Sequence, residues 1–327
     1  MKMAEMHLWV AAPLLLALLY ALTALPKPDK EGINERPIVG ILTQETTDET
    51  LKPFGKIYIP ASYVKYLESA GCRVAPIRLN LPEAEYEKLF QSINGILFPG
   101  GAVDLQTSDF AKAAGIFYRL ALQAFHSGDY FPIWGTCLGL QLLTVLTAGE
   151  NLLSDALAEN ISLPLNLTED AASSRMFRDF PPDLLKAVSQ EKLTANFHHY
   201  GIGTQESGKG WVFQANARLR EFYTVLSTNR DDLGKEFVST MEGKVYPMYG
   251  VQWHPEVNRF EWKKDFAYPH SINAVNLASF MADFFVNEAR KSAHRFASTE
   301  EEEMALIYHH CPIYVGNFSS YEQVYFF

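Results

Sequence analysis

Apolar runs alternate with amphipathic stretches from about residue 36 onward, and this alternation predicts strands separated by helices. The predicted strands are near-continuous apolar runs, at 37–44, 72–79, 94–101 and 131–137. The predicted helices space their apolar residues three and four apart, at 60–71, 84–93, 110–128 and from Leu138 onward. Because strands that are apolar on both faces need helices on each side, the pattern predicts an α/β domain with a doubly wound, mostly parallel sheet.

The pattern changes after about residue 151, where proline and asparagine become frequent and the apolar runs become short. We expect added β-rich segments in this C-terminal half, at 211–217, 222–229, 236–243 and 245–256. A long helix is predicted at 272–291, and the acidic run 300–303 is typical of a solvated helix start. A β-like tail is predicted to close the chain at 305–327.

The first residues have the layout of a secretory signal peptide. Lys2 precedes an apolar run at 8–22, and small residues follow that run before a polar, proline-bearing stretch. The run is somewhat short for a membrane span, although an uncleaved signal anchor is the alternative. We therefore predict no membrane association after cleavage and the following organisation: a signal peptide at 1–24, a linker at 25–35 and one large domain at 36–327.

Composition and charge narrow the class of protein. The chain has 327 residues, of which 48% are hydrophobic, so it can bury a full core and is not predicted to be disordered. Its formal net charge is -10, whereas a protein that binds nucleic acid needs clustered lysine and arginine. We therefore expect no nucleic-acid partner.

Entry into the secretory pathway would affect the redox state of the cysteines and the glycosylation of the asparagine sequons. The three cysteines are an odd number, so at least one thiol is expected to stay free in an oxidising compartment. A bridge between Cys72 and Cys311 is one alternative, and a place for Cys72 in the core is the other. Three Asn-X-Ser/Thr sequons are candidate glycosylation sites if they lie on the surface: Asn160, Asn166 and Asn317.

Chemistry-bearing residues follow three of the predicted strands. The segment 98–104 reads FPGGAVD, Cys137 follows the strand at 131–137, and the segment 252–256 reads QWHPE. Because functional groups in a parallel sheet gather beyond the carboxyl ends of the strands, we expect these segments to lie together.

Cys137 lies between two glycines where a strand turns into a helix. Such a thiol can be an inert core residue, or a nucleophile stabilised by the helix N-terminus. A nucleophile needs a base and an orienting carboxylate, which His254 and Glu256 supply from one short turn. The alternative for that pair is a buried histidine that bonds a neighbouring carboxylate.

Gly100 and Gly101 allow the backbone to approach a substrate closely, and the N–H of Leu138 opens the predicted helix after Cys137. Backbone N–H groups of this kind can stabilise a tetrahedral oxyanion. The alternative for the two glycines is an ordinary turn at the end of a strand.

Several stretches together resemble the class I glutamine amidotransferase-like family, in particular its members that cleave γ-glutamyl bonds. The stretches are YIPASYVKYLESAG, SINGILFPGG, FPIWGTCLGLQ, LTANFHHY, STMEG and YGVQWHPE. The similarity covers about residues 36–327, including the tail EEEEMALIY. It implies a flavodoxin-like sheet and hydrolysis of folylpoly-γ-glutamates, small-molecule substrates, with no cofactor and no metal.

The resemblance also implies a role for individual residues. Cys137 would be the nucleophile, His254 the acid and base, and Glu256 its orienting partner. The N–H groups of Gly101 and Leu138 would form the oxyanion hole. Further residues would contact substrate: Tyr63, Gly100, Gln141 and His198. For His198, a packed or surface position is the alternative.

Two rival functions stay open from the sequence. A stand-alone glutaminase would use the same residues, because glutamine and a γ-glutamyl peptide are both γ-carboxamides of glutamate. A catalytically inactive protein that binds folate or polyglutamate is the other rival, and the intact Cys137, His254 and Glu256 set argues against it. The resemblance further suggests a homodimer and a lysosomal or secreted destination.

Overall fold

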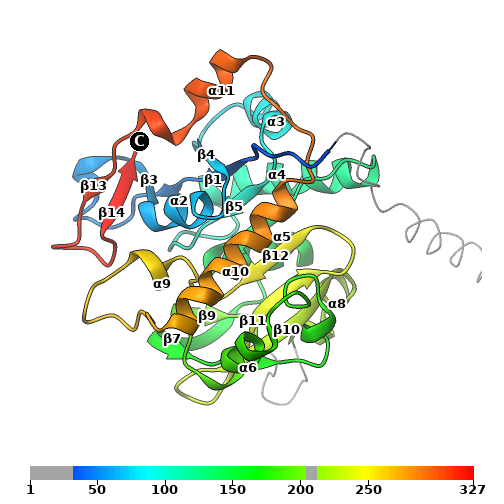
Figure 1. Cartoon of the computed structure of the whole chain (residues 1–327), viewed down its shortest axis with the longest axis vertical. Coiled ribbons are helices and arrows are strands. Elements are labelled where there is room, and N and C mark those ends of the chain that lie inside the picture. The colour runs from blue at the N-terminus through cyan, green and yellow to red at the C-terminus, as the bar shows by residue number, and fades with distance from the viewer. Residues whose placement is uncertain (1–31, 204–211) are drawn as a thin grey trace, which may run out of the picture.

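The central feature of the computed structural model, which describes residues 32–203 and 212–327, is an eight-stranded sheet (Figure 1). Its strands lie in the order β4-β1-β5-β6-β12-β11-β10-β8, and every pair from β4 to β12 is parallel. The last three strands pair antiparallel. The predicted mostly parallel sheet is therefore confirmed. The bounds in that order are Arg73–Ile77, Ile38–Leu42, Ile96–Phe98, Ile133–Thr136, Met248–Val251, Glu236–Gly243, Tyr223–Arg230 and Asn166–Leu167.

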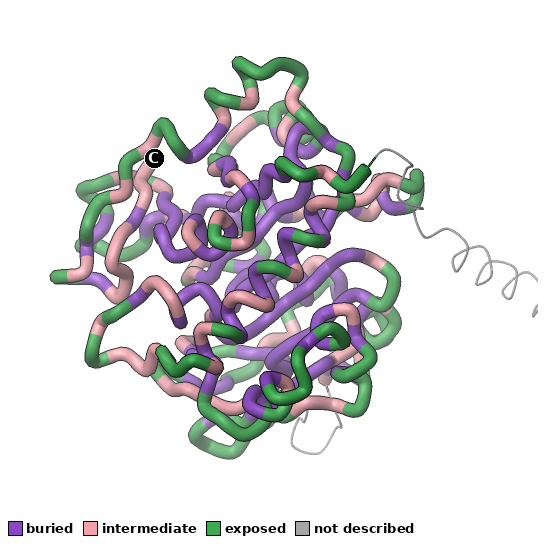
Figure 2. Tube along the Cα trace, in the orientation of Figure 1, coloured by how far each residue is buried: buried purple, intermediate pink, exposed green. Residues whose placement is uncertain are grey.

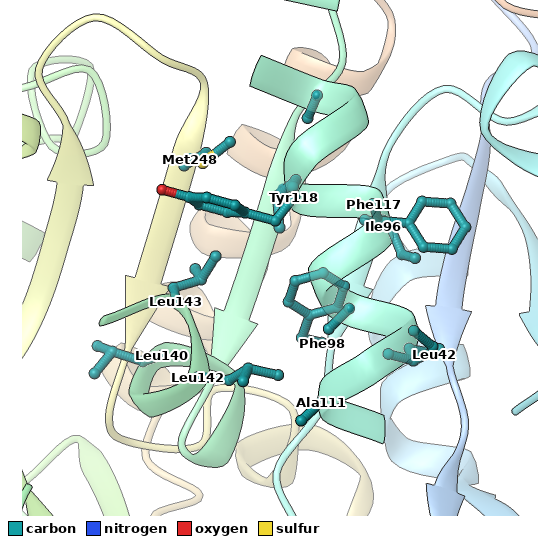
Figure 3. Close-up of a cluster of buried hydrophobic side chains, with 14 of the residues drawn as sticks. Leu42, Ile96, Phe98, Ala111, Phe117, Tyr118, Leu140, Leu142, Leu143 and Met248 are labelled. Atoms are coloured by element: carbon teal, nitrogen blue, oxygen red, sulfur yellow. The ribbon is translucent and has the colours of Figure 1, made fainter. Parts of the chain in front are cut away.

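Helices cover both faces of this sheet, and each face has its own core. Along β5, Ile96 and Phe98 pack into one cluster and Leu97 into the other, because successive side chains of a strand point to opposite faces. Figure 3 shows residues of the first cluster, among them Phe98 and, beside Ile96, Phe117. The helices on that face are α3 (Glu83–Ser92), α4 (Asp109–His126) and α5 (Leu138–Ala148). Those on the other face are α2 (Ala61–Glu68), α6 (Pro182–Gln190) and α10 (Ile272–Ala289).

Figure 2 shows that the buried part of the chain runs through the sheet and the inner side of α10. None of the helices in the described ranges is both long enough and apolar enough to cross a bilayer. The predicted signal peptide and most of the predicted linker lie outside those ranges.

Two smaller sheets flank the central one. Strands β7 (Ser154–Leu163) and β9 (Thr194–Gly201) form an antiparallel pair. The other small sheet has the order β13-β14-β3-β2, with bounds Ile313–Tyr314, Gln323–Phe326, Ile57–Pro60 and Gln44–Glu45. The β segments predicted at 222–229, 236–243 and 245–256 are also present, as β10, β11 and β12 of the central sheet.

The prediction of β structure at 211–217 is wrong for the residues that the structure describes. These residues form α7 (Val212–Ala215) and the start of α8 (Ala217–Phe222). The Asn216 side chain caps α8, accepting a hydrogen bond from the Leu219 N–H at 3.1 Å. This local cap favours the start of α8 at Ala217 over a continued strand.

The acidic run begins a helix, as predicted. Helix α11 (Thr299–Ala305) has Glu300, Glu301 and Glu302 in its first turn, and the Ser298 hydroxyl caps it. The predicted β-like tail is mostly not strand: after the 3-10 turn η3 (Ile307–His309) come the two short strands β13 and β14.

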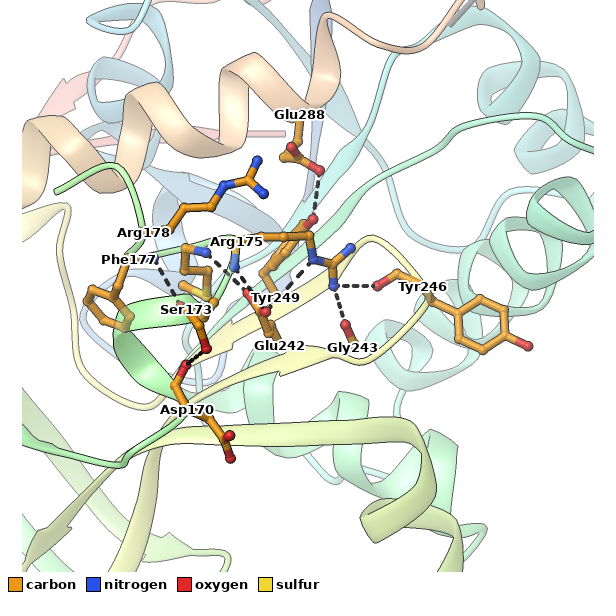
Figure 4. Close-up of polar contacts among 12 residues, drawn as sticks. Asp170, Ser173, Arg175, Phe177, Arg178, Glu242, Gly243, Tyr246, Tyr249 and Glu288 are labelled. Atoms are coloured by element: carbon orange, nitrogen blue, oxygen red, sulfur yellow. Dashed lines mark hydrogen bonds and ion pairs between the residues drawn. The ribbon is translucent and has the colours of Figure 1, made fainter. Parts of the chain in front are cut away.

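A buried polar network ties the segment after β8 to the sheet and to α10 (Figure 4). Arg175 donates a hydrogen bond to the Gly243 carbonyl and lies with its guanidinium 5.0 Å from the centre of the Tyr249 ring. Glu242 accepts a hydrogen bond from the backbone N–H of Arg175, and the Tyr249 hydroxyl donates to Glu288 at 2.6 Å. These polar groups have partners within the fold, so we assign the network a structural role.

Candidate active site

The three segments that were predicted to meet at the strand ends lie side by side. Strands β5, β6 and β12 are neighbours in the sheet and run parallel. Phe98 pairs with Gly135, and Val251 pairs with Thr136, so the strands end at nearly the same level. The turns that carry Gly100, Cys137 and His254 therefore leave the sheet at one edge.

Cys137 occupies a sharp turn between β6 and α5. Its backbone has a φ of 52° and a ψ of -106°, a conformation that residues with a side chain seldom adopt, and its N–H donates to the Val251 carbonyl at 2.8 Å. A Cβ at Gly139 would lie 2.1 Å from the Phe98 carbonyl oxygen, and a Cβ at Gly135 would lie 2.5 Å from the Gly139 carbonyl carbon. The two glycines therefore let helix and strands pack tightly enough to hold the thiol in this turn.

His254 and Glu256 form a buried pair beside this turn. The imidazole Nδ1 donates to Oε1 of Glu256 at 2.7 Å, and Glu256 is only 2% exposed. The His254 N–H donates to the Ala195 carbonyl on β9 at 2.9 Å, which fixes the backbone of the turn. The other ring nitrogen, Nε2, is buried and has no nitrogen or oxygen partner among the described residues.

The charge state of His254 depends on both neighbours. Burial lowers the pKa of its imidazole, but the negative charge of Glu256 and the charge and hydrogen bonding of Cys137 outweigh that effect and raise the pKa to about 10. A positively charged imidazole between a carboxylate and a thiolate is the arrangement that a cysteine nucleophile needs.

The glycine pair lies directly against these side chains. A Cβ at Gly100 would lie 2.8 Å from Cε1 of His254 and 3.5 Å from the Cβ of Cys137. The backbone of this turn therefore lies closer to the two side chains than at an ordinary strand end. The N–H of Gly100 is already used, since it donates to the Tyr63 hydroxyl at 2.9 Å. That hydroxyl lies 3.4 Å from Nδ1 of His254, which places the predicted contact residue Tyr63 beside the pair.

The predicted oxyanion donors differ from Gly100 in their surroundings. Leu138 begins α5, and the first N–H groups of a helix have no acceptor within it. A Cβ at Gly101 would lie 2.5 Å from the side-chain amide carbon of Gln44, so a buried glutamine supports this part of the backbone. Sequence reasoning missed Gln44, because nothing in its strand marks it as a neighbour of Gly101.

Gln141 and His198 meet at one carbonyl group. Nε2 of Gln141 and Nδ1 of His198 both donate to the Tyr200 carbonyl, at 2.8 and 3.0 Å. Nε2 of Gln141 also donates to the Gln252 side chain at 3.2 Å. Burial, and then the nearby charge of His254, lower the pKa of His198 to about 4, so this ring is neutral. The Gln141 bond ties β9 to the first turn of α5, whereas the His198 bond lies within β9. The contact of both residues with substrate stays a prediction.

Cys72 and Cys311 form no disulfide, and the asparagines of the three sequons lie on the surface. All three cysteines are free. Cys72 packs in the core, which was the other alternative. The sequon asparagines are all exposed, and their glycosylation stays a prediction: Asn160, Asn166 and Asn317.

Sequence reasoning also missed a second buried carboxyl group near Glu256. Burial raises the pKa of Glu261 to about 7, although the Glu322 N–H donates to this carboxyl at 2.6 Å. Within residues 32–203 and 212–327, no group of three or more His, Cys, Asp or Glu side chains could hold a metal ion.

A cysteine at the strand-to-helix turn of a doubly wound sheet lies next to a His–Glu pair that follows the neighbouring strand, which is the arrangement that the sequence predicted. A model of the family Peptidase C26 matches residues 37–256, and the chain belongs to this family.

Curated relatives match over most of the chain. A protein named Gamma-glutamyl hydrolase from Homo sapiens is 53% identical over 294 residues, which cover 90% of each chain. The protein of the same name from Bos taurus is 49% identical and covers 94% of this chain and 93% of its own. Gamma-glutamyl hydrolase B from Dictyostelium discoideum is 40% identical and covers 90% of this chain and 84% of its own.

Proposed function

We propose that the chain is a γ-glutamyl hydrolase, a cysteine peptidase that cleaves the γ-glutamyl bonds of folylpoly-γ-glutamates and of antifolate polyglutamates. Its membership of the Peptidase C26 family and its similarity to curated gamma-glutamyl hydrolases support this activity. The observation that carries the proposal is the geometry at the strand ends, where the Cys137 turn faces a His254 ring held at 2.7 Å by Glu256.

In the first half of the reaction, the Cys137 thiolate attacks the γ-carbonyl carbon of the substrate. The carbonyl oxygen becomes an oxyanion, which accepts hydrogen bonds from the N–H groups of Gly101 and Leu138. When the C–N bond breaks, the His254 imidazolium gives its Nε2 proton to the departing amine. The products of this half are the free amine and a γ-glutamyl thioester on Cys137.

In the second half, water attacks the thioester carbonyl. Neutral His254 accepts a proton from this water, the C–S bond breaks, and the thiolate leaves. The released product is the γ-carboxylic acid, and the thiolate and the imidazolium form again. Glu256 holds the ring in place and stabilises its positive charge through both halves.

The decisive experiment compares three substrates: pteroyltri-γ-glutamate, a γ-glutamyl dipeptide and free glutamine. We expect hydrolysis of the first two, with glutamine a poor substrate, and no hydrolysis by a Cys137→Ala control. Release of ammonia from glutamine as the fastest of the three reactions would instead favour the rival glutaminase. Turnover by the alanine variant would contradict the thiol mechanism.

We also propose that the chain enters the secretory pathway, with a signal peptide at 1–24, a linker at 25–35 and the catalytic domain at 36–327. A lysosomal or secreted destination and a homodimer go with this proposal. The layout of the first residues and three exposed sequons support the secretory route. Mature protein that begins near residue 25 and loses mass on deglycosylation is expected, whereas an N-terminal sequence starting at Met1 would contradict cleavage. Light scattering would give the oligomeric state.

A further inference from the structure

An aromatic ring on β9 lies against the catalytic histidine. The Phe197 ring centre is 5.9 Å from that of His254, and the two rings meet edge to face at 67°. Phe197 lies on the strand segment that the site holds at both ends, through the bond from His254 to Ala195 and the bond from Gln141 to Tyr200. The side chain is nevertheless partly exposed, so this ring forms a surface beside the reacting groups.

The loop between α9 (Val257–Phe260) and α10 extends this surface (Figure 1). The Phe266 ring centre is 5.8 Å from that of Phe197, and the Tyr268 ring centre is 5.4 Å from it. Phe266 and Tyr268 stack on each other at 5.4 Å and 17°. Phe197, Phe266 and Tyr268 are all partly exposed, and together they form what we call the aromatic wall.

Hydrogen bonds from two sides fix the loop that carries this wall. On the β7 side, Asn160 accepts from the Ala267 N–H at 2.7 Å, and the Ser162 hydroxyl donates to the Ala267 carbonyl at 2.6 Å. On the other side, the Tyr268 hydroxyl donates to the Ser320 carbonyl at 2.9 Å. A surface held in this way loses little conformational freedom when a ligand binds to it.

A cation stands at the edge of the wall. The Lys263 ammonium lies 5.5 Å from the centre of the Phe266 ring and donates to the Ser319 carbonyl at 2.8 Å. An ammonium has three N–H donors, so this bond leaves others for a ligand carboxylate. The exposed Lys264 adds a second positive charge to the loop, which also carries the carboxyl groups of Glu261 and Asp265.

The position of the aromatic wall indicates which part of the substrate it contacts. In the proposed reaction His254 protonates the departing amine, so a surface that contacts the His254 ring borders the leaving group rather than the acyl group. An amine that fits here presents an aromatic ring to the wall and a carboxylate to Lys263. Both groups occur together in an aromatic amino acid.

We propose that the aromatic wall and Lys263 form a leaving-group subsite for aromatic amino acids, so that the chain hydrolyses γ-glutamyl dipeptides ending in phenylalanine or tyrosine. This inference rests on the proposed function and adds a second substrate class to it. In the reaction, one water cleaves the γ-amide bond of γ-glutamyl-phenylalanine and gives glutamate and phenylalanine.

The test measures kcat/KM of the full chain on γ-glutamyl-phenylalanine and γ-glutamyl-alanine. Ring stacking should favour the phenylalanine compound about three- to tenfold. Phe266→Ala should bring this ratio close to one, and Phe266→Leu, which keeps apolar volume, should lower it as well. Trp262→Leu is the matched control, because it removes an exposed aromatic ring of the same loop that stacks on His270 outside the wall, and it should retain the ratio.

The cation is tested with the same dipeptide in two forms, the free acid and the C-terminal amide. Lys263→Gln should lower kcat/KM for the acid more than for the amide, since the amide has no carboxylate to lose. Equal losses on both forms would remove Lys263 from the subsite and overturn that part of the proposal.

Equal kcat/KM of the wild type on the two dipeptides would overturn the inference. It would also be overturned if the variants lowered kcat/KM equally on both dipeptides and lowered the melting temperature too. The second pattern would mean that the rings only hold the loop. In either case, cleavage of pteroyltri-γ-glutamate would leave the proposed function intact. A chain that cleaves none of these γ-glutamyl compounds would instead contradict the proposed function itself.

Discussion

The molecule contains two histidine–carboxylate pairs with the same separation, to which we assign different roles. His254 bonds Glu256 at 2.7 Å, and His294 bonds Asp129 at 2.7 Å. The difference lies at the second ring nitrogen. Nδ1 of His294 lies 2.6 Å from the Phe90 carbonyl, whereas Nε2 of His254 has no nitrogen or oxygen partner among the described residues and is influenced by the Cys137 thiol.

This difference separates a structural histidine from a reactive one. At His294, both nitrogens face oxygen acceptors that belong to the fold, so the ring joins the end of α3 to the segments around Asp129 and His294. At His254, one nitrogen is committed to orientation and the other is left to exchange a proton. Burial next to a carboxylate is therefore a poor sign of catalysis, and an uncommitted nitrogen beside a nucleophile is a better one.

The largest loss of activity is expected from a substitution in the His254–Glu256 pair. His254→Asn should lower kcat by about 10⁴-fold, because it removes the acid that an amine leaving group needs. The melting temperature should fall as well at neutral pH, because the charged ring stabilises the fold, so a γ-glutamyl peptide assay run beside thermal melts gives the turnover per folded molecule. A variant with normal turnover per folded molecule would remove His254 from catalysis.

A smaller loss of turnover is expected from Glu256→Gln. The amide can still hold the ring but cannot balance the charge of the imidazolium, so kcat should fall by about 10²-fold while KM changes little. Steady-state kinetics on γ-glutamyl-alanine separate the two parameters. If activity instead fell only in step with the fraction of folded protein, the pair would be structural, as His294 and Asp129 are.

The opposite pattern is expected at the second pair. His294→Gln should lower the free energy of unfolding by about 1–3 kcal/mol, because it disturbs a bond to a carboxylate and leaves buried acceptors without a partner. Its kcat per folded molecule should equal that of the wild type. Urea unfolding and active-site titration test this, and a selective loss of kcat would break the comparison.

A dependence of stability on pH is also expected. The pKa of His254 is about 10 in the folded chain and near 6.5 in an unfolded one, so its contribution to stability is complete below about pH 6.5 and is lost as the pH rises toward 10. The difference in unfolding free energy between wild type and His254→Asn should therefore shrink across that range. A difference that grows with pH would contradict the raised pKa.

The sequence predicted the site because the site obeys a rule of parallel sheets. Gly100, Cys137 and His254 follow three strands, and the carboxyl ends of neighbouring parallel strands share one edge. Contacts between distant segments that do not follow neighbouring parallel strands could not be predicted. Asp129 is 165 residues from His294, and no local pattern joins them. The aromatic wall likewise depends on how a loop folds back on β9.

Local signals also competed in ways that periodicity does not resolve. The apolar residues near 213 favoured a strand, but they form α7, and the Asn216 cap starts α8 directly after it. The glycines around Cys137 indicated a tight turn, yet the backbone angles of the cysteine itself could not be predicted from them.

Those angles have a consequence for anyone who engineers the chain for heat resistance. A positive φ with a side chain attached costs about 1–3 kcal/mol, and glycine relieves this cost because it has no Cβ. A selection for thermal survival that ignores activity is therefore expected to favour glycine at position 137. The most stabilised chain from such a selection would be an inactive one.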